Sequence, residues 1–100
     1  MANITQARKA VVERITAGDG KASTEHRRAA FDGAGPEGAG GLIEKVTQHA
    51  YKVTDEDIAQ AKAAGFSEDQ IFELVICAAV GQANRQLENA LAALDEATKV

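Results

Sequence analysis

Apolar residues recur every three or four positions over most of the chain, which is the spacing of one face of an α-helix. The first such segment covers residues 4–17, where a single face combines Ile4, Ala7, Val11 and Ile15. We expect Asn3 to cap this helix at its start and Gly18–Asp19–Gly20 to end it. The pattern therefore predicts an amphipathic N-terminal helix with a sharp stop.

A shorter helix is predicted to begin at Ser23 or Thr24 and to run to about Phe31, where Asp32–Gly33 closes it. The stretch 33–41, GAGPEGAGG, follows with five glycines and the only proline of the chain. Such a composition is typical of a flexible loop, and we interpret it as the connection between two parts of one domain.

A third helix is predicted from about residue 42 to residue 52. Its apolar face combines Leu42, Val46, His49 and Val53. Thr54 then caps a fourth helix, whose first turn holds the three acids of residues 55–57 at the positive end of the helix dipole. Gly65 stands where the C-terminal cap of that helix belongs.

Ser67 and Gln70 predict a capping box at the start of the last helix. Residues 71–80 are apolar almost all round, which is typical of a helix buried in the domain centre or at a subunit interface. A stripe of Leu87, Leu91 and Leu94 follows. A helix from Glu68 to about Ala97 would be about 45 Å long, longer than a compact domain whose radius of gyration is about 13 Å. Either the helix breaks near Gly81, or its C-terminal part packs on another chain.

Together these elements predict an all-α fold, a bundle of about five helices in one domain of residues 1–100. We divide it into N-terminal helices at 1–32, the Gly-rich loop at 33–41 and a helical core at 42–100. The hydrophobic share is 45% and the aromatic share 4%, so the core must be built mainly from small aliphatic residues, which suit close helix packing. Small cores of this kind often gain stability by oligomerising, and we expect a homo-oligomer.

The net charge of −4 argues against nucleic acid or an anionic membrane as partner. The N-terminal sequence lacks the apolar stretch of a signal peptide, and no segment approaches the roughly 20 apolar residues of a membrane span, so a cytoplasmic location is expected. The charge is uneven, with a net +2 in residues 1–32 and −6 in the remainder. Either these are ordinary solvated helix faces, or the N-terminal arm is complementary to a neighbouring subunit.

Cys77 is the only cysteine, so no internal disulfide can form, which fits a reducing compartment. His26 and His49 are 23 residues apart without metal-ligand spacing around either. The Gly-rich stretch 33–41 lacks the Gly-Lys-Ser/Thr ending of a phosphate loop. We therefore expect neither a metal nor a cofactor, while a small-molecule ligand stays open.

The second half of the chain contains a recognisable sequence motif. A helix ending in Ala63–Ala64–Gly65 leads into FSEDQIFEL and then into an Ala-rich helix with a late Asn-Arg. Over residues 45–97 the chain resembles the repeat unit of the alkylhydroperoxidase D-like family, which includes the carboxymuconolactone decarboxylases. The resemblance implies an alkylhydroperoxidase D-like helical fold and says little about residues 1–41.

In active members of that family, the helix before this motif contains Cys-x-x-Cys followed, after three further residues, by a His. Counting back from Gly65 places Ala50 and Val53 at the two cysteine positions and Asp57 at the histidine position. Dithiol reduction of peroxide needs a thiolate to attack and a second thiol to resolve the sulfenic acid. With one cysteine in the chain, intramolecular dithiol chemistry is excluded.

Four residues remain as candidates for other chemistry, namely His49, Glu73, Arg85 and Cys77. His49 is either a half-buried hydrogen-bonded residue or a catalytic one. Glu73 is a proton-relay acid, lies on an exposed stripe, or pairs with an arginine at an interface. Arg85 is expected to reach Glu88 on the next turn. Cys77, in the apolar segment ICAAV, is expected to be an inert core thiol rather than a reactive one.

Three functions follow from these residues. The first is a divergent family member without dithiol peroxidase activity, acting as a small binding or assembly module. The second is a decarboxylase-like enzyme that acts on a small organic acid or lactone through His49, Glu73 or Arg85. The third is a one-cysteine peroxidase that uses Cys77 with an external thiol.

Overall fold

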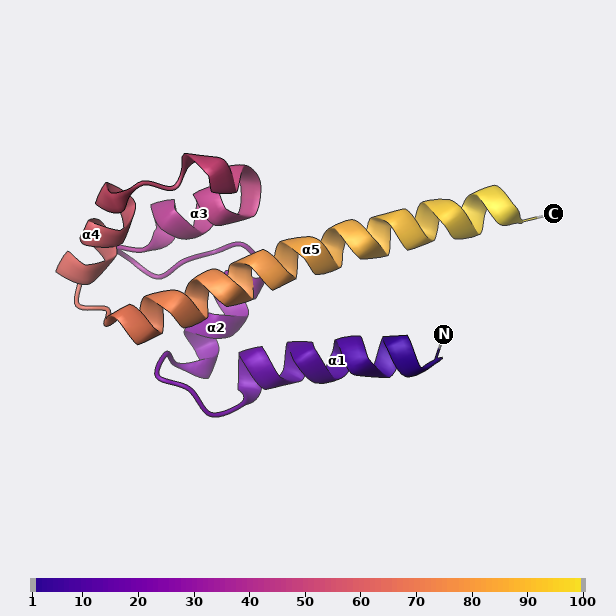
Figure 1. Cartoon of the computed structure of the whole chain (residues 1–100), viewed down its shortest axis with the longest axis horizontal. Coiled ribbons are helices and arrows are strands. Elements are labelled where there is room, and N and C mark those ends of the chain that lie inside the picture. Colours follow the sequence, from indigo (N-terminus) through magenta and orange to yellow (C-terminus); the bar gives the residue numbers. More distant parts are fainter. Residues whose placement is uncertain (1, 100) are drawn as a thin grey trace.

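The computed structural model of the chain describes residues 2–99, and every regular element in that range is a helix (Figure 1). The elements in chain order are α1 (Ala2–Ala17), α2 (Thr24–Phe31), α3 (Gly40–His49), the short 3-10 helix η1 (Ala50–Lys52), α4 (Asp55–Ala63) and α5 (Glu68–Thr98). The expected all-α bundle of about five helices is confirmed.

The predicted helix starts rest on side-chain caps that the structure contains. The Ser23 hydroxyl accepts a hydrogen bond from the backbone N–H of His26 at the start of α2. Complete capping boxes open α4, with Thr54 and Asp57, and α5, with Ser67 and Gln70. Each satisfies backbone N–H groups that a helix start leaves without an intrahelical acceptor.

Two predicted boundaries are wrong. Helix α1 begins at Ala2, so Asn3 lies within its first turn and not before it. Helix α3 begins at Gly40, inside the predicted loop 33–41.

The third predicted helix does not run unbroken to residue 52. Its α-helical part ends at His49, whose backbone leaves the helical region (φ −148°, ψ 62°), and η1 follows. Because the backbone turns there, the face predicted to link Val46, His49 and Val53 is interrupted.

Helix α5 passes through Gly81 without a break, so of the two outcomes left open for this helix the break is wrong. Gly81 is buried, and α2 ends against it. A β-carbon on Gly81 would overlap the carbonyl group of Phe31. The glycine therefore permits close approach of two helices, a role that helical spacing alone does not reveal.

Helix α5 is the axis on which the other elements pack (Figure 1). One core cluster joins α2, α3 and α5 around Ala30, Ile43 and Leu74, with Cys77 among its buried members. A second joins α3, α4 and α5 around Leu42, Ala61 and Ile71. Helix α1 packs against α2 and α5.

The molecule is elongated, with principal extents of 55 × 29 × 16 Å and a radius of gyration of 15.2 Å. A compact 100-residue domain would have a radius of gyration of about 13 Å. The difference comes from α5, whose 31 residues span about 46 Å. Every residue from Gln86 to Lys99 is exposed, so the C-terminal end of α5 projects beyond the packed core. No helix within residues 2–99 is long and apolar enough to cross a bilayer.

Candidate functional site

The three positions at which the resemblance places the family's Cys-x-x-Cys-x-x-x-His lie in three different local structures. Ala50 begins η1, Val53 is in an extended linker, and Asp57 is in the first turn of α4. The Asp57 carboxylate serves the capping box and accepts hydrogen bonds from the Lys45 ammonium at 2.9 and 3.0 Å. The Thr54 backbone N–H and the Lys45 ammonium both lower the pKa of Asp57. This segment therefore works as a helix start and an ion pair.

Cys77 is 1% exposed and belongs to the central core cluster. Its sulfhydryl donates to the backbone carbonyl of Ile15, with Sγ and O 3.3 Å apart. Burial raises the pKa of the thiol, the Arg27 charge opposes this rise, and the Glu73 charge adds to it. A protonated thiol without access to solvent is a poor nucleophile.

Glu73 does not lie on an exposed stripe, because its side chain faces the loop between α1 and α2. Its half-buried carboxylate accepts hydrogen bonds at 2.9 Å from the backbone N–H groups of Lys21 and Ala22, in the loop between α1 and α2. Burial raises the pKa of Glu73, but these two N–H groups and the charges of Arg27 and Lys21 outweigh it, and the net pKa is lowered. The residue anchors the α1–α2 loop to α5.

Arg27 is a buried charged side chain beside Glu73 that the sequence pattern does not reveal. It is 5% exposed, and its guanidinium donates to the carbonyl oxygens of Ala22 and Ile15 at 3.1 and 3.2 Å, with a longer contact to the Thr24 hydroxyl. An arginine in a short helix of mostly polar residues carries no sequence signal of burial. Together with Glu73 it holds the α1–α2 loop by charged groups.

His49 and Arg85 lie elsewhere. The expectation of a half-buried His49 is wrong, because its side chain is exposed beside the Tyr51 ring, with ring centroids 6.0 Å apart. Arg85 does not pair with Glu88. Its guanidinium donates to the Phe31 carbonyl at 2.6 Å and to the Gln82 side chain at 3.1 Å. It thus satisfies a carbonyl at the end of α2.

The residues proposed for a decarboxylase-like site do not converge. Glu73 and Arg85 are twelve residues apart on one helix, which corresponds to about 18 Å along its axis. His49, at the end of α3, is exposed. No described hollow is lined by two of these three side chains.

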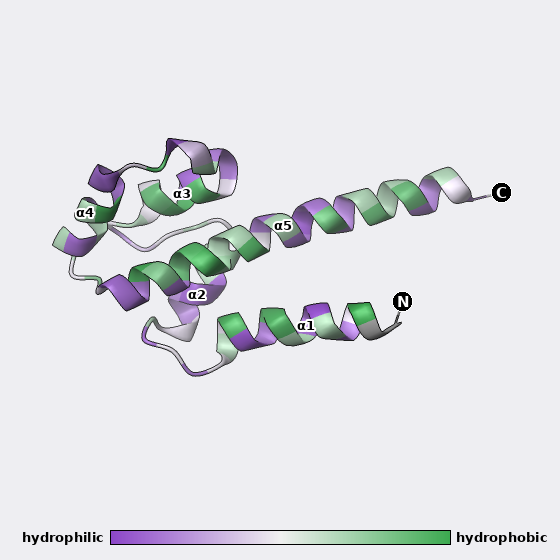
Figure 2. Ribbon diagram, viewed as in Figure 1, coloured by the Kyte–Doolittle hydropathy of each residue, from purple (hydrophilic) through white to green (hydrophobic). Residues whose placement is uncertain are grey.

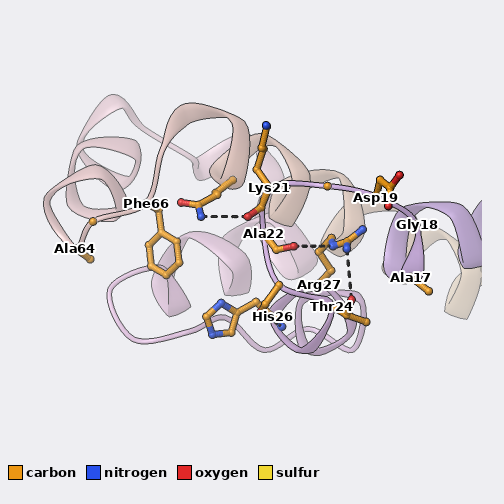
Figure 3. Close-up of a pocket in the computed structure, with 14 residues that line it drawn as sticks. Ala17, Gly18, Asp19, Lys21, Ala22, Thr24, His26, Arg27, Ala64 and Phe66 are labelled. Atoms are coloured by element: carbon orange, nitrogen blue, oxygen red, sulfur yellow. Dashed lines mark hydrogen bonds between the residues drawn. The ribbon is translucent and has the colours of Figure 1, made fainter.

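A polar hollow of about 630 Å³ lies beside the α1–α2 loop (Figure 3). Figure 3 shows that the guanidinium of Arg27 is turned toward Ala22 and Thr24, while His26 and Phe66 face each other. The Gln70 amide donates to the Lys21 carbonyl at 3.2 Å. The Arg27 and Gln70 side chains of the hollow are thus engaged with the protein itself.

An extended apolar surface follows α5. One face of this helix points away from the core residues Leu74, Cys77 and Ala78, and each of its members is exposed or half-buried. We call it the outer face of α5, and it comprises Phe72, Ile76, Ala79, Val80, Ala83, Leu87, Ala90 and Leu94. Figure 2 shows that hydrophobic residues continue along α5 toward its C-terminal end.

Two hollows lie along this face, both formed with α1. The first, of about 230 Å³, is lined almost wholly by apolar groups, with Val11 of α1 opposite Val80, Ala83 and Leu87. The second, of about 370 Å³, is lined by Arg14, Ile15, Phe72 and Ile76 among others. Exposure along the face is large, with Phe72 65% and Leu94 60% exposed. Contiguous apolar surface of this kind is typical of a protein interaction site.

Comparison with protein-family models, with curated proteins and with solved structures gave no match. The resemblance to the alkylhydroperoxidase D-like family therefore stays a prediction.

Proposed function

We propose that this protein is a small helical assembly module that associates with further copies of itself through the outer face of α5 and the adjoining face of α1. It is a divergent relative of the alkylhydroperoxidase D-like proteins without dithiol peroxidase activity. The observation that carries the proposal is the apolar outer face of α5, which continues past the end of the packed core.

The cysteine content of the chain supports the proposed absence of dithiol peroxidase activity. Peroxide reduction by a dithiol needs two thiols, and the chain has one. That thiol is buried and donates to a backbone carbonyl. Ala50, Val53 and Asp57, at the family's motif positions, carry neither a thiol nor an imidazole.

The exposure of α5 supports self-association. Leu87, Leu91 and Leu94 are 41%, 44% and 60% exposed in the single chain. A free helix end of this length gains little stability from its own hydrogen bonds, because most helical stability in proteins comes from packing of the apolar face. Packing of the outer face against another copy would bury Leu87 and Leu94, at about 25 cal/mol per Å² of apolar surface removed from water.

Charge favours a second copy of this chain as the occupant. Helix α1 carries Arg8, Lys9 and Arg14 against the single acid Glu13. The exposed residues 86–99, at the end of α5, carry three acids against one base; the acids are Glu88, Asp95 and Glu96, and the base, Lys99, pairs with the last two. Each copy thus offers a basic helix and an acidic helix end, which are complementary when two copies meet.

Sedimentation velocity over a range of protein concentrations tests the proposal. We expect the native chain to sediment as an oligomer, and Leu87→Glu to weaken the association at least tenfold, because it places a charge in the apolar contact. Ala92→Glu is the matched control. It lies nine residues from Ala83, about two and a half turns, and therefore on the opposite side of α5.

A native chain that stays monomeric at the highest attainable concentration would contradict self-association. Consumption of hydroperoxide by the purified protein with a dithiol reductant would contradict the absence of peroxidase activity. The two assays are independent, so either part of the proposal can fail alone.

A further inference from the structure

We infer that two copies pair through α5 in antiparallel orientation, with the two-fold axis passing close to Ala83, so that each copy covers the other's α1–α5 hollows. This inference rests on the proposed self-association and adds its geometry, its register and its partner residues. It follows from the order of side-chain sizes along the outer face and from the distribution of charge.

The outer face keeps to one side of α5 over its whole length. Phe72, Ala83 and Leu94 follow one another at intervals of eleven residues, which is close to three full helical turns. An eleven-residue spacing drifts little around a straight helix, whereas a seven-residue spacing drifts by about 20° per repeat. Two straight helices could therefore remain in contact along this face from one end to the other.

Side-chain size along the face is complementary to itself when the helix is reversed about Ala83. Residues equally distant from Ala83 then lie opposite each other. Leu87 faces the partner's Ala79, and Ile76 faces the partner's Ala90. In these two pairs a large side chain meets a small one, the arrangement that lets two layers interdigitate without voids. At the centre, Ala83 and the partner's Ala83 allow the two helix backbones to come close.

The ends of the pairing also fit. Phe72 lies opposite the partner's Leu94, at the hollow of about 370 Å³ lined by Arg14, Phe72 and Ile76. The hollow of about 230 Å³ beside Val80 and Ala83 is close to the partner's Leu87. Both hollows are open in the single chain and would be covered by leucines of the second copy.

Charge separates the antiparallel pairing from the parallel one. Helix α1 lies along the middle of α5, as the contacts of Ile15 with Cys77 and of Arg8 with Asn84 and Glu88 show. Antiparallel pairing about Ala83 brings the partner's Glu88 level with Ala78, beside the end of α1 that carries Arg14, and the partner's Asp95 level with Ile71, just beyond α1. Parallel pairing would instead place the two acidic ends together and align the two helix dipoles, and both effects are repulsive.

Oxidative cross-linking of variants that each carry one introduced cysteine besides the buried Cys77 tests the register. We expect Ala83→Cys to form a disulfide-linked dimer under mild oxidation, because the two introduced thiols lie close to the two-fold axis. A disulfide requires Cα atoms within about 7 Å of each other. In an antiparallel pair the two copies of residue 94 are about 33 Å apart, so Leu94→Cys is expected not to link to itself.

Three further samples complete the design. An equimolar mixture of Phe72→Cys and Leu94→Cys is expected to link, because these residues lie opposite each other. Ala92→Cys, on the back of α5, and the native chain, whose Cys77 is buried, are expected to give no linked dimer. Circular dichroism of each variant checks that the helical fold is kept.

Each outcome has a definite meaning. Self-linking of Leu94→Cys as efficient as that of Ala83→Cys would overturn the antiparallel register while leaving self-association intact. If the variants form an oligomer of native mass but neither Ala83→Cys nor the mixture of Phe72→Cys and Leu94→Cys gives a disulfide-linked dimer, α5 is not the contact between the copies. A monomeric native chain would overturn the proposed function as well, and sedimentation velocity distinguishes that case from the others.

Discussion

Phe31 and Gly81 are in direct backbone contact, and the Phe31 carbonyl at the end of α2 lies where a β-carbon of residue 81 would stand. The same carbonyl accepts a hydrogen bond of 2.6 Å from the Arg85 guanidinium, one turn further along α5. Glycine provides the space and arginine satisfies the carbonyl, which a helix end leaves without an intrahelical donor. This contact fixes where α2 ends on α5.

Gly81→Ala is therefore expected to destabilise the chain strongly, by about 3 kcal/mol or more, because the new methyl group would force the two helices apart. Higher helix propensity offsets only about 1 kcal/mol of this cost. Gly41→Ala is the matched control, since nothing lies within 4 Å of a β-carbon there and the residue is in helix α3. Urea denaturation followed by circular dichroism measures both. A Gly81 variant as stable as the Gly41 variant would contradict the close contact.

The fold was largely predictable because its boundaries rest on local chemistry. Thr54, Ser67 and Gly65 act through hydrogen bonds or backbone angles set within a few residues, and such signals are visible in the sequence. The break after His49 carries no comparable signal, since the apolar spacing continues across it. Periodicity therefore placed His49 on a core face from which the backbone turns away.

The roles of the candidate residues were much less predictable, because they depend on contacts between distant segments. Glu73 bonds to the backbone of Lys21 and Ala22, about fifty residues away in the chain. Arg85 was assigned the neighbour Glu88 but bonds to Phe31. Helical spacing finds partners on the same helix and contains no information about backbone acceptors on another one.

Glu73→Gln should lower the free energy of unfolding at neutral pH by about 1–3 kcal/mol. The carboxylate accepts from two backbone N–H groups, and hydrogen bonds to a charged acceptor are the stronger kind. An amide has only one oxygen with which to replace them. Glu44→Gln, on the exposed side of α3, is the control and should change stability little. Equal stability of the two variants would argue against the loop anchor.

The same residue gives the chain a pH dependence of defined sign. Burial raises the pKa of Glu73, but the N–H groups of Ala22 and Lys21 and the charges of Arg27 and Lys21 outweigh it, and the net pKa in the folded chain is below the ordinary value of 4.5. A carboxyl whose folded pKa is lowered stabilises the fold above its unfolded pKa, and this contribution is lost as the pH falls through the folded value. The stability difference between the native chain and Glu73→Gln should therefore shrink below pH 4.5. A difference that stayed constant or grew on acidification would contradict this assignment.

Thr47 offers a test in the stabilising direction. Its hydroxyl oxygen is buried and has no hydrogen-bond partner among the described residues. Thr47→Val replaces the hydroxyl by a methyl group of similar size, so we expect a gain of about 1 kcal/mol in the free energy of unfolding. Thr16→Val is the contrast, because the buried Thr16 hydroxyl donates to the Val12 carbonyl at 2.7 Å. Thr16→Val is therefore expected to lose stability. Thermal denaturation measures both variants, and a Thr47→Val variant less stable than Thr16→Val would contradict the unpaired Thr47 hydroxyl.

Cys77 should react with a thiol reagent only when the chain opens. Its thiol is buried, and burial, opposed in part by Arg27 and aided by Glu73, raises its pKa. We expect alkylation in the native chain to be at least about a thousandfold slower than in denaturant, which corresponds to an opening free energy of about 4 kcal/mol. The introduced thiol of Ala92→Cys, at an exposed position on the same helix, should react at the rate of a free cysteine. Because both thiols are measured in one protein with one reagent, the ratio of the two rates reports how far the fold limits access to Cys77. Equal rates at the two sites would restore the one-cysteine peroxidase as a function of this chain.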